Sequence, residues 1–390
     1  MAKRYRVTLT AQERATLGGM ISRGKADARK LAHARVLLQA DASEGGPNWT
    51  DTRIAEAAIV TLTEQRRSDT FWVKEIAAMT LPASLAHPCY HDDDAARVTF
   101  EAIRWPDGPY CPHCGVFDSV APLGGKSMGP GWYWCNKCRE KFTARVGSVM
   151  ERSHIPMHKW LLAFRLLASS KKGMSAHQLH RMLGVSYKAA WFMAHRIREA
   201  MRPIDVEPMG GEGKFVEVDE TFVGGKAANR AYAKMAPCKE AVVSLVERGG
   251  KVRSCHVSDV TATTLKPILV EAIAKDTHFR TDQSPVYTGV GAGFTSHATV
   301  NHSIKEYVRG DAHTNTVEGY FSIFKRGIYG TYHHVSAEHL KRYLAEFDFR
   351  YNERIALGVD DTERTTKAIR GAVGKRLTYR QPRGAQQAQA

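Results

Sequence analysis

Two Cys-x-x-Cys pairs constrain the fold of this chain more than any other feature of its sequence. Cys111 and Cys114 form the first pair, Cys135 and Cys138 form the second, and twenty residues separate them. Each pair suits a tight turn whose backbone N–H groups face the sulfurs, and two such turns supply the four thiolates that tetrahedral zinc prefers. Because four protein ligands leave no open position, we expect a structural zinc. The alternatives are four buried free thiols or a redox dithiol, and the double pairing disfavours both.

The charge of the chain indicates its partner. The 390 residues include 56 Lys and Arg against 40 Asp and Glu, a formal net charge of +16. Such an excess is typical of proteins that bind nucleic acid. Residues 139–205 hold thirteen basic and four acidic side chains, or +9, so we expect the main phosphate-contacting surface there. The chain has no apolar run long enough to span a membrane and no apolar signal core at its N-terminus, so we expect a cytoplasmic protein.

A helix-turn-helix is predicted within a helical region over residues 156–202. Ser175 caps a first helix, residues 184–186 make a short turn, and residues 187–201 form a second helix. The second helix carries the basic side chains Lys188, His195, Arg196, Arg198 and Arg202. We therefore expect this helix to face a DNA groove. The alternative is a helical hairpin with a solvated basic face.

Residues 214–354 alternate between strand-like and helical patterns, which indicates an α/β domain. The first strand carries Asp219 in mid-course, with Glu217 on the same face, and an antiparallel hairpin follows it. After a helix, a short strand ends in Asp282. A further helix then places Asn315, Glu318 and Lys325 along one stripe beside an apolar face. By itself that polar stripe is also consistent with a solvated helix face.

The order of these elements favours a catalytic role for the carboxylates. Three strands with an Asp on the first, a helix, a strand ending in Asp and a helix bearing Glu form the layout of ribonuclease-H-like nucleotidyl transferases. Asp219, Asp282 and Glu318 from three elements suit two divalent ions roughly 3.5–4 Å apart, as in-line phosphoryl displacement requires. Mg²⁺ or Mn²⁺ suits such an all-oxygen site.

Residues from about 85 to 380 resemble the bacterial insertion-sequence transposases that join an N-terminal zinc ribbon to a DDE nuclease. The resemblance implies that Asp219, Asp282 and Glu318 are the catalytic carboxylates and that Lys325, seven positions after Glu318, is the downstream basic residue. It also implies action on double-stranded DNA, at terminal inverted repeats and a target site, by a homo-oligomer in a bacterial nucleoid. The matching segments are Cys111-Pro-His-Cys114, Trp134-Cys-Asn-Lys-Cys138, Val218-Asp219-Glu-Thr-Phe-Val-Gly-Gly-Lys226, Thr281-Asp282, His302-Ser, His313-Thr-Asn-Thr-Val-Glu-Gly-Tyr-Phe-Ser322, Lys325-Arg326-Gly327 and Glu346-Phe-Asp-Phe-Arg-Tyr-Asn352.

Residues 1–66 resemble the N-terminal helical DNA-binding part of the mariner-like transposases. Thr10 and Glu13 have the spacing of a capping box before a helix. The likeness ends near Gln65, so we expect a truncated unit.

The sequence thus predicts a multidomain chain: a zinc ribbon and a helix-turn-helix region followed by an α/β ribonuclease-H-like core. The predicted parts are a helical unit (1–66), a linker (67–107), the ribbon (108–147), the helix-turn-helix region (156–202), the DDE domain (214–354) and a C-terminal tail (355–390). The predicted function is metal-dependent strand cleavage and strand transfer at insertion-sequence ends. Two alternatives remain open: a non-catalytic DNA-binding regulator and a structure-specific DNA nuclease.

Overall fold

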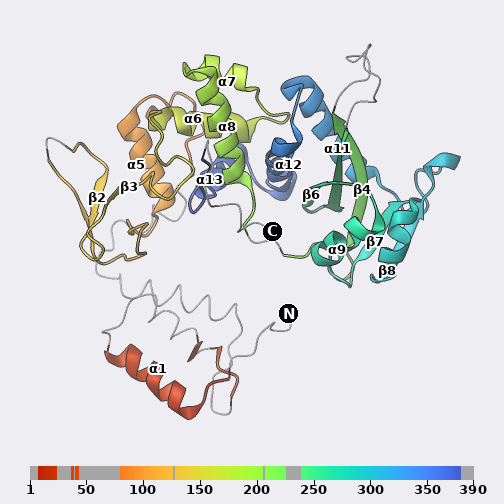
Figure 1. Ribbon diagram of the computed structural model, residues 1–390, viewed down its shortest axis with the longest axis horizontal. Helices are drawn as coiled ribbons and strands as arrows, with labels where there is room; N and C mark the ends of the chain where they lie inside the picture. Colours follow the sequence, from red (N-terminus) through yellow and green to blue (C-terminus); the bar gives the residue numbers. More distant parts are fainter. Residues whose placement is uncertain are drawn as a thin grey trace. The chain divides into compact units, whose positions relative to one another are not determined.

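The computed structural model describes residues 8–23, 37–38, 40–43, 80–125, 128–204, 207–224 and 239–378. The chain divides into two compact units, Met1–Ala78 and Met79–Ala390. In the first unit, helix α1 (Ala11–Arg23) begins with the predicted capping box (Figure 1). The Thr10 N–H donates to the Glu13 carboxylate at 2.9 Å, and the Glu13 N–H donates to Thr10 Oγ1 at 3.2 Å. Most of the helical unit predicted over residues 1–66 lies outside the described residues.

The second unit contains a small sheet, a group of helices and a larger sheet (Figure 1). Its strands are β1 (Val120–Pro122), β2 (Trp132–Cys135), β3 (Lys141–Thr143), β4 (Phe215–Gly224), β5 (Lys239–Glu247), β6 (Val252–Val257), β7 (His278–Asp282) and β8 (Ser296–Val300). Its α-helices are α5 (Asp93–Arg104), α6 (Met157–Ser169), α7 (Ala176–Leu183), α8 (Tyr187–Met201), α9 (Ala262–Ala272), α10 (Thr288–Gly291), α11 (Asn315–Gly327), α12 (Ala337–Asn352) and α13 (Asp361–Arg370). Short helical turns are η1 (Pro88–Tyr90), η3 (Pro285–Tyr287), η4 (His302–Ile304), η5 (Ile328–Tyr332) and η6 (Ile355–Leu357). None of the described helices is both long and apolar enough to cross a membrane.

The small sheet is an antiparallel ribbon in the order β1-β2-β3. The aromatic run that starts at Trp132 forms β2 and leads into the second cysteine pair. Tyr133 and Phe142 are cross-strand partners, and their rings stack 5.7 Å apart. Trp105 packs edge-on against both rings. Aromatic packing therefore stabilises a sheet that is too small to form an apolar core of its own.

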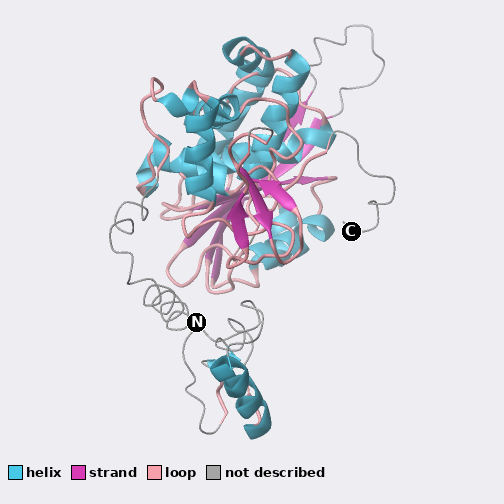
Figure 2. Ribbon diagram, turned by 90° about the vertical axis from the view of Figure 1, so that its left-hand side faces the viewer, coloured by secondary structure: helices cyan, strands magenta, loops and turns pink. Residues whose placement is uncertain are grey.

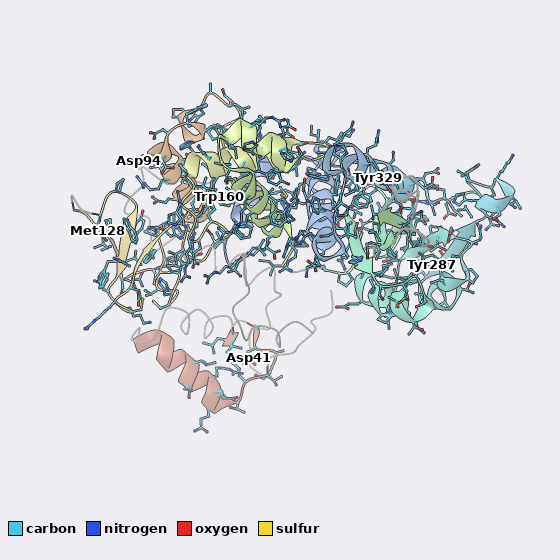
Figure 3. The ribbon with its side chains drawn as sticks, turned by 45° about the horizontal axis from the view of Figure 1, so that its top comes forward. Asp41, Asp94, Met128, Trp160, Tyr287 and Tyr329 are labelled. Atoms are coloured by element: carbon cyan, nitrogen blue, oxygen red, sulfur yellow. The ribbon has the colours of Figure 1, made fainter. Side chains whose placement is uncertain are left out.

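The prediction of a linker over residues 67–107 was wrong where α5 forms. The acidic run Asp92-Asp93-Asp94 starts this helix. Asp92 is the N-cap and accepts from the Ala95 N–H at 2.7 Å, while Asp93 and Asp94 lie in the first turn (Figure 3). The helix dipole favours negative charge at that end. Phe100 on the inner face is fully buried, so the nearby prolines bound a packed helix instead of marking a linker.

The prediction of a C-terminal tail over residues 355–390 was wrong for its first part. Helix α13 packs against α5, α6 and α8, from which it is distant in sequence (Figure 1). Ala368, Ile369 and Ala372 are fully buried in the same apolar core as Trp160, which Figure 3 labels among these helices. The α13 sequence is mostly polar, with Ala368 and Ile369 as its apolar residues, so it showed no apolar stripe typical of a packed helix.

The helix-turn-helix pattern folds with the predicted bounds. Ser175 caps α7, Gly184 ends it in the left-handed conformation at φ 59°, and Ser186 caps α8. The expected outward basic face is only partly present. Arg198 is 2% exposed and pairs with Glu346 of α12 at 2.6 Å, and His195 is also buried. The C-terminal half of α8 is therefore an interior helix, because α12 covers the face that a lone helical hairpin would expose.

The larger sheet has the strand order β6-β5-β4-β7-β8. β4, β5 and β6 are antiparallel neighbours, whereas β7 runs parallel to β4 and β8 parallel to β7. Val216 and Val218 pack with α9 on one face, and Val242 and Val246 pack with α11 and α12 on the other. Figure 2 shows helices on both faces of this sheet. The predicted hairpin β5–β6 is present.

Helix α12 connects the larger sheet to the group of helices. The side chains that make these contacts lie at every second position from 346 to 352. Asp348 accepts from the Ser254 N–H of β6 at 2.7 Å, and the Asn352 amide bonds both the N–H and the carbonyl of Val252. Glu346 accepts from Arg198 of α8 and from Tyr332, and it pairs with Arg350. Although burial raises it, Arg350 and Arg198 hold the pKa of Glu346 down at about 2. The motif at residues 346–352 is therefore structural.

Candidate metal centres and the carboxylate site

The four paired cysteines converge as the sequence predicted. The ligand atoms of Cys111, Cys114, Cys135 and Cys138 all lie within 4.8 Å of one another. The sulfurs of Cys111 and Cys138 are 3.5 Å apart, and those of Cys114 and Cys135 are 3.6 Å apart. These separations fit a tetrahedron with Zn–S bonds of about 2.3 Å.

Each cysteine pair forms a turn of the same shape. Gly115 at φ 73° and Arg139 at φ 56° directly follow the second cysteine of each pair, and each N–H donates to the carbonyl of the first cysteine. Burial raises the pKa of Cys135, but backbone N–H donors and the neighbouring thiols bring it down to about 7, whereas burial and the thiols of Cys111 and Cys135 raise the pKa of Cys138 to about 12. A thiol that ionises near neutral pH is suited to binding a metal.

Asp219 lies in the middle of β4, and its carboxyl group is mostly buried. Burial raises its pKa to about 7, and the negative charges of Glu220, Asp282 and Glu318 act in the same direction. The Glu220 N–H, which donates to Asp219 Oδ1 at 2.8 Å, only partly opposes this shift. The site therefore concentrates negative charge around a carboxyl group that cannot easily ionise alone.

Asp282 and Glu318 are held by neighbours from separate elements. Asp282, at the end of β7, accepts from the Ser284 N–H at 3.0 Å. Glu318, in the first turn of α11, accepts from Thr314 Oγ1 at 3.0 Å and lies 3.5 Å from His302 Nε2. The Glu318 side chain is 48% exposed, so the site opens to solvent on this side.

Asn315 and Lys325 lie at opposite ends of α11. Asn315 is the first residue of the helix and is exposed, whereas Lys325 is half-buried in its last turn. The structure places Asn315 one turn before Glu318 and Lys325 two turns after it. The predicted stripe is therefore formed by one continuous helix.

Sequence reasoning gave no role to Glu220, Tyr287 or His302, which also surround the site. The Tyr287 hydroxyl donates to Glu220 Oε2 at 2.5 Å, and burial raises the pKa of Glu220 (Tyr287 is labelled in Figure 3). His302 was quoted only as part of a matching segment. A signal for Glu220 was available, because it is a second carboxylate directly after Asp219 in the same strand.

The donors fit divalent cations. Asp219, Asp282 and Glu318 offer only oxygen atoms, and like charges dominate the surroundings of Asp219. A bound cation would remove the cost of ionising Asp219.

Comparison with known proteins identifies two domains of the chain. The family model of the transposase zinc-ribbon domain matches residues 91–141, which includes α5 and the cysteine cluster. The family model of the ISXO2-like transposase domain matches residues 210–352, from before β4 to the end of α12. The chain is also 30% identical over 267 residues to an uncharacterized protein in transposable element ISH50 of Halobacterium salinarum. The matched segment covers 64% of this chain and 87% of that relative. This chain therefore belongs to the IS1595-type family of insertion-sequence transposases, in which a transposase zinc ribbon precedes an ISXO2-like transposase domain.

Proposed function

We propose that this protein is an active DDE transposase, which cleaves DNA strands at the ends of an insertion sequence and joins them to target DNA. One observation carries the proposal: the partly buried Asp219 lies close enough to Glu220, Asp282 and Glu318 that, together with burial, their charges raise its pKa to about 7. Like charges gathered around a partly buried carboxyl group are costly to the fold, and a cation requirement explains them. Asp219, Asp282 and Glu318 would hold Mg²⁺ or Mn²⁺.

The strand arrangement supports a ribonuclease-H-like core. Three antiparallel strands followed by two strands parallel to the first give the order β6-β5-β4-β7-β8, with Asp219 on the central strand. Asp282 ends the neighbouring strand, and α11 packs against β4 and β5. Ligands of α/β sheets bind where the order of strands changes direction, which here is at β4.

Each residue of the site has a distinct task in this proposal. When bound, the divalent ions activate water for strand cleavage and then the resulting 3′-hydroxyl for strand transfer. Asp219 would lose its proton when it binds the ions. His302 orients Glu318 together with Thr314, which donates to it. Lys325 binds a phosphate of the DNA, and Asn315 orients Glu318 or the DNA strand.

The remaining parts would bind and position the DNA. The four-cysteine ribbon carries structural zinc, and the helix-turn-helix region contacts the terminal inverted repeats through the exposed Lys171, Lys172 and Arg181. We further propose that a homo-oligomer assembles on the DNA, because the two ends of an element must be cut together. The protein would act in the cytoplasm, on the nucleoid.

The test is an in vitro reaction with DNA fragments that carry the ends of the element. Wild type should cleave and join strands with Mg²⁺ or Mn²⁺, whereas Asp219→Asn, Asp282→Asn and Glu318→Gln should each lose both steps and still bind the ends. End binding should survive because it depends on basic groups. Glu363→Gln, which removes an exposed carboxylate of α13, is the matched control and should leave both steps intact.

The same reaction separates the two alternatives. A DNA-binding regulator would bind the ends without any cleavage in the wild type. A structure-specific nuclease would cleave branched DNA and release products without joining them. Cleavage and joining by Glu318→Gln at the wild-type rate would contradict the proposed site.

A further inference from the structure

A buried charged residue lies two positions before each of the two strand carboxylates. Glu217 of β4 and Arg280 of β7 are partners in the register of the two strands. Asp219 and Asp282 lie two positions later in the same strands. Glu217 is 0% exposed and Arg280 is 4% exposed. Since side chains alternate along a strand, Glu217 and Asp219 share the face that α11 covers. These buried charges therefore belong to the layer directly beneath the carboxylate site.

Glu217 binds the start of α11. Its Oε2 accepts from the Thr316 N–H at 2.8 Å and from the Val317 N–H at 3.1 Å, and its Oε1 accepts from Thr316 Oγ1 at 2.8 Å. Glu318 is the next residue in the chain. One carboxylate of β4 thus satisfies two of the free N–H groups in the first turn of the helix, where the dipole favours a negative charge.

Arg248 and Arg280 bind the loop that precedes α11. Arg248 donates to Glu217 Oε1 at 2.5 Å and also to the carbonyls of Asp311 and His313, at 2.8 and 3.0 Å. Arg280 donates to the Asp311 carboxylate at 2.6 Å. Both guanidinium groups lie 5.0 Å from the centre of the Phe215 ring, which is within the range of a cation–π contact.

These contacts join three separate elements at one point. Glu217 comes from β4, Arg280 from β7, and Arg248 from the turn after β5, and all three converge on residues 311–317. His313 of the same loop meets this carboxylate as well, with its Nδ1 3.1 Å from Glu217 Oε1. Burying a carboxylate completely is costly unless it is fully paired, and Glu217 is fully paired.

We propose that Glu217, Arg248 and Arg280 form a positioning clamp that sets Glu318 at the correct distance from Asp219 and Asp282 for metal binding. The inference rests on the proposed function, because it assigns the clamp a task in holding the three carboxylates for divalent ions. The clamp touches neither ion nor DNA. It acts through the α11 backbone. Thr314, at the end of the same loop, donates directly to the Glu318 carboxylate at 3.0 Å.

The main test variant is Glu217→Gln in the full-length protein. The amide keeps the shape and one acceptor oxygen but loses the charge that Arg248 and the two N–H groups share. Hydrogen bonds to charged groups are stronger than neutral ones, so exchange of the Thr316 and Val317 amides with deuterium should accelerate roughly tenfold. Mn²⁺ affinity, measured by calorimetry on DNA-free protein, should fall by roughly tenfold as well. Binding to element ends should not change.

Two further variants guard against a protein that fails to fold. Asp311→Asn weakens the Arg280 arm at a side chain that is 55% exposed, so folding is preserved, and Mn²⁺ affinity should fall by a smaller factor. Glu363→Gln removes a carboxylate of similar exposure from a helical ion pair on α13 and should change neither exchange nor Mn²⁺ binding.

Three outcomes overturn the clamp. Wild-type Mn²⁺ affinity in both Glu217→Gln and Asp311→Asn is the first. Unchanged exchange at Thr316 and Val317 in Glu217→Gln is the second. Uniformly faster exchange across β4 and β7 is the third, because it would mean that the charges serve stability alone. Failure of the proposed function looks different: Asp219→Asn would then cleave DNA or bind Mn²⁺ as tightly as wild type.

Discussion

Replacing Asp219 with Asn should stabilise the metal-free protein while abolishing its chemistry. Burial and three neighbouring carboxylates raise the pKa of Asp219 to about 7. In the unfolded chain an aspartate titrates near 3.9. At pH values between these two pKa values, Asp219 keeps its proton in the folded state and releases it in the unfolded state. Raising the pH through this window therefore favours unfolding, and the loss is complete above about pH 7.

The size of the effect follows from the gap between the two pKa values. About three units correspond to about 4 kcal/mol of unfolding free energy at pH 8, and to less than about 2 kcal/mol at pH 5. Asparagine keeps the shape of the protonated acid and cannot ionise. Asp219→Asn should therefore gain up to about 4 kcal/mol at pH 8, which for a domain of this size raises Tm by roughly 10 °C.

Differential scanning calorimetry at pH 5 and pH 8 measures this difference. Divalent ions should be removed by passage over a resin, because a soluble chelator would also extract zinc from the ribbon. Adding Mg²⁺ at pH 8 should raise the Tm of wild type and leave Asp219→Asn unchanged. Glu318→Gln, which removes only one exposed neighbouring charge, should give a smaller gain. An Asp219→Asn protein that is less stable than wild type at pH 8, or equally stabilised at both pH values, would refute the reasoning.

Three further predictions concern the ribbon and the DNA-binding region. Elemental analysis should find one zinc per chain, and Cys135→Ser should lose it and unfold the ribbon; a zinc content near zero in wild type purified without chelator contradicts the assignment. Arg198→Met should lower the unfolding free energy by roughly 3–5 kcal/mol, because it leaves the buried Glu346 partly unpaired; a calorimetric change within about 0.5 kcal/mol would show that Arg350 and Tyr332 suffice. Arg181→Gln should reduce the slope of log K against log salt for end binding by roughly 0.9, with Glu363→Gln as the control; an unchanged slope would exclude a phosphate contact at Arg181.

The sequence predicted those parts of the fold in which one local pattern determines one structure. The cysteine spacing located the metal cluster, Ser175, Gly184 and Ser186 located the ends of α7 and α8, and alternation located β4. Each signal is short-range, so no knowledge of distant residues was needed.

The errors arose where distant segments decide burial. Arg198 has the composition of a DNA-contacting residue, and only α12, nearly 150 positions away, converts it to an interior ion pair. Helices α5 and α13 are short and polar on one side. Their apolar faces can be recognised as buried only once their packing against α6 is known. Glu217 was placed on the correct face of its strand, but its partners Arg248 and Thr316 come from other elements.

Helix α12 limits how this protein can be recombined with its relatives. Asp348 and Asn352 face β6, whereas Glu346 and Arg350 face α8 and the carbonyl of Leu167 in α6. Exchanging the helix-turn-helix region alone would leave the negative charge of Glu346 beside a surface that has lost Arg198. A functional chimera must therefore exchange α8 and α12 together, or replace both charges at once. Through α12, helices α7 and α8 and the larger sheet form one structural block, although their sequences suggest separable modules.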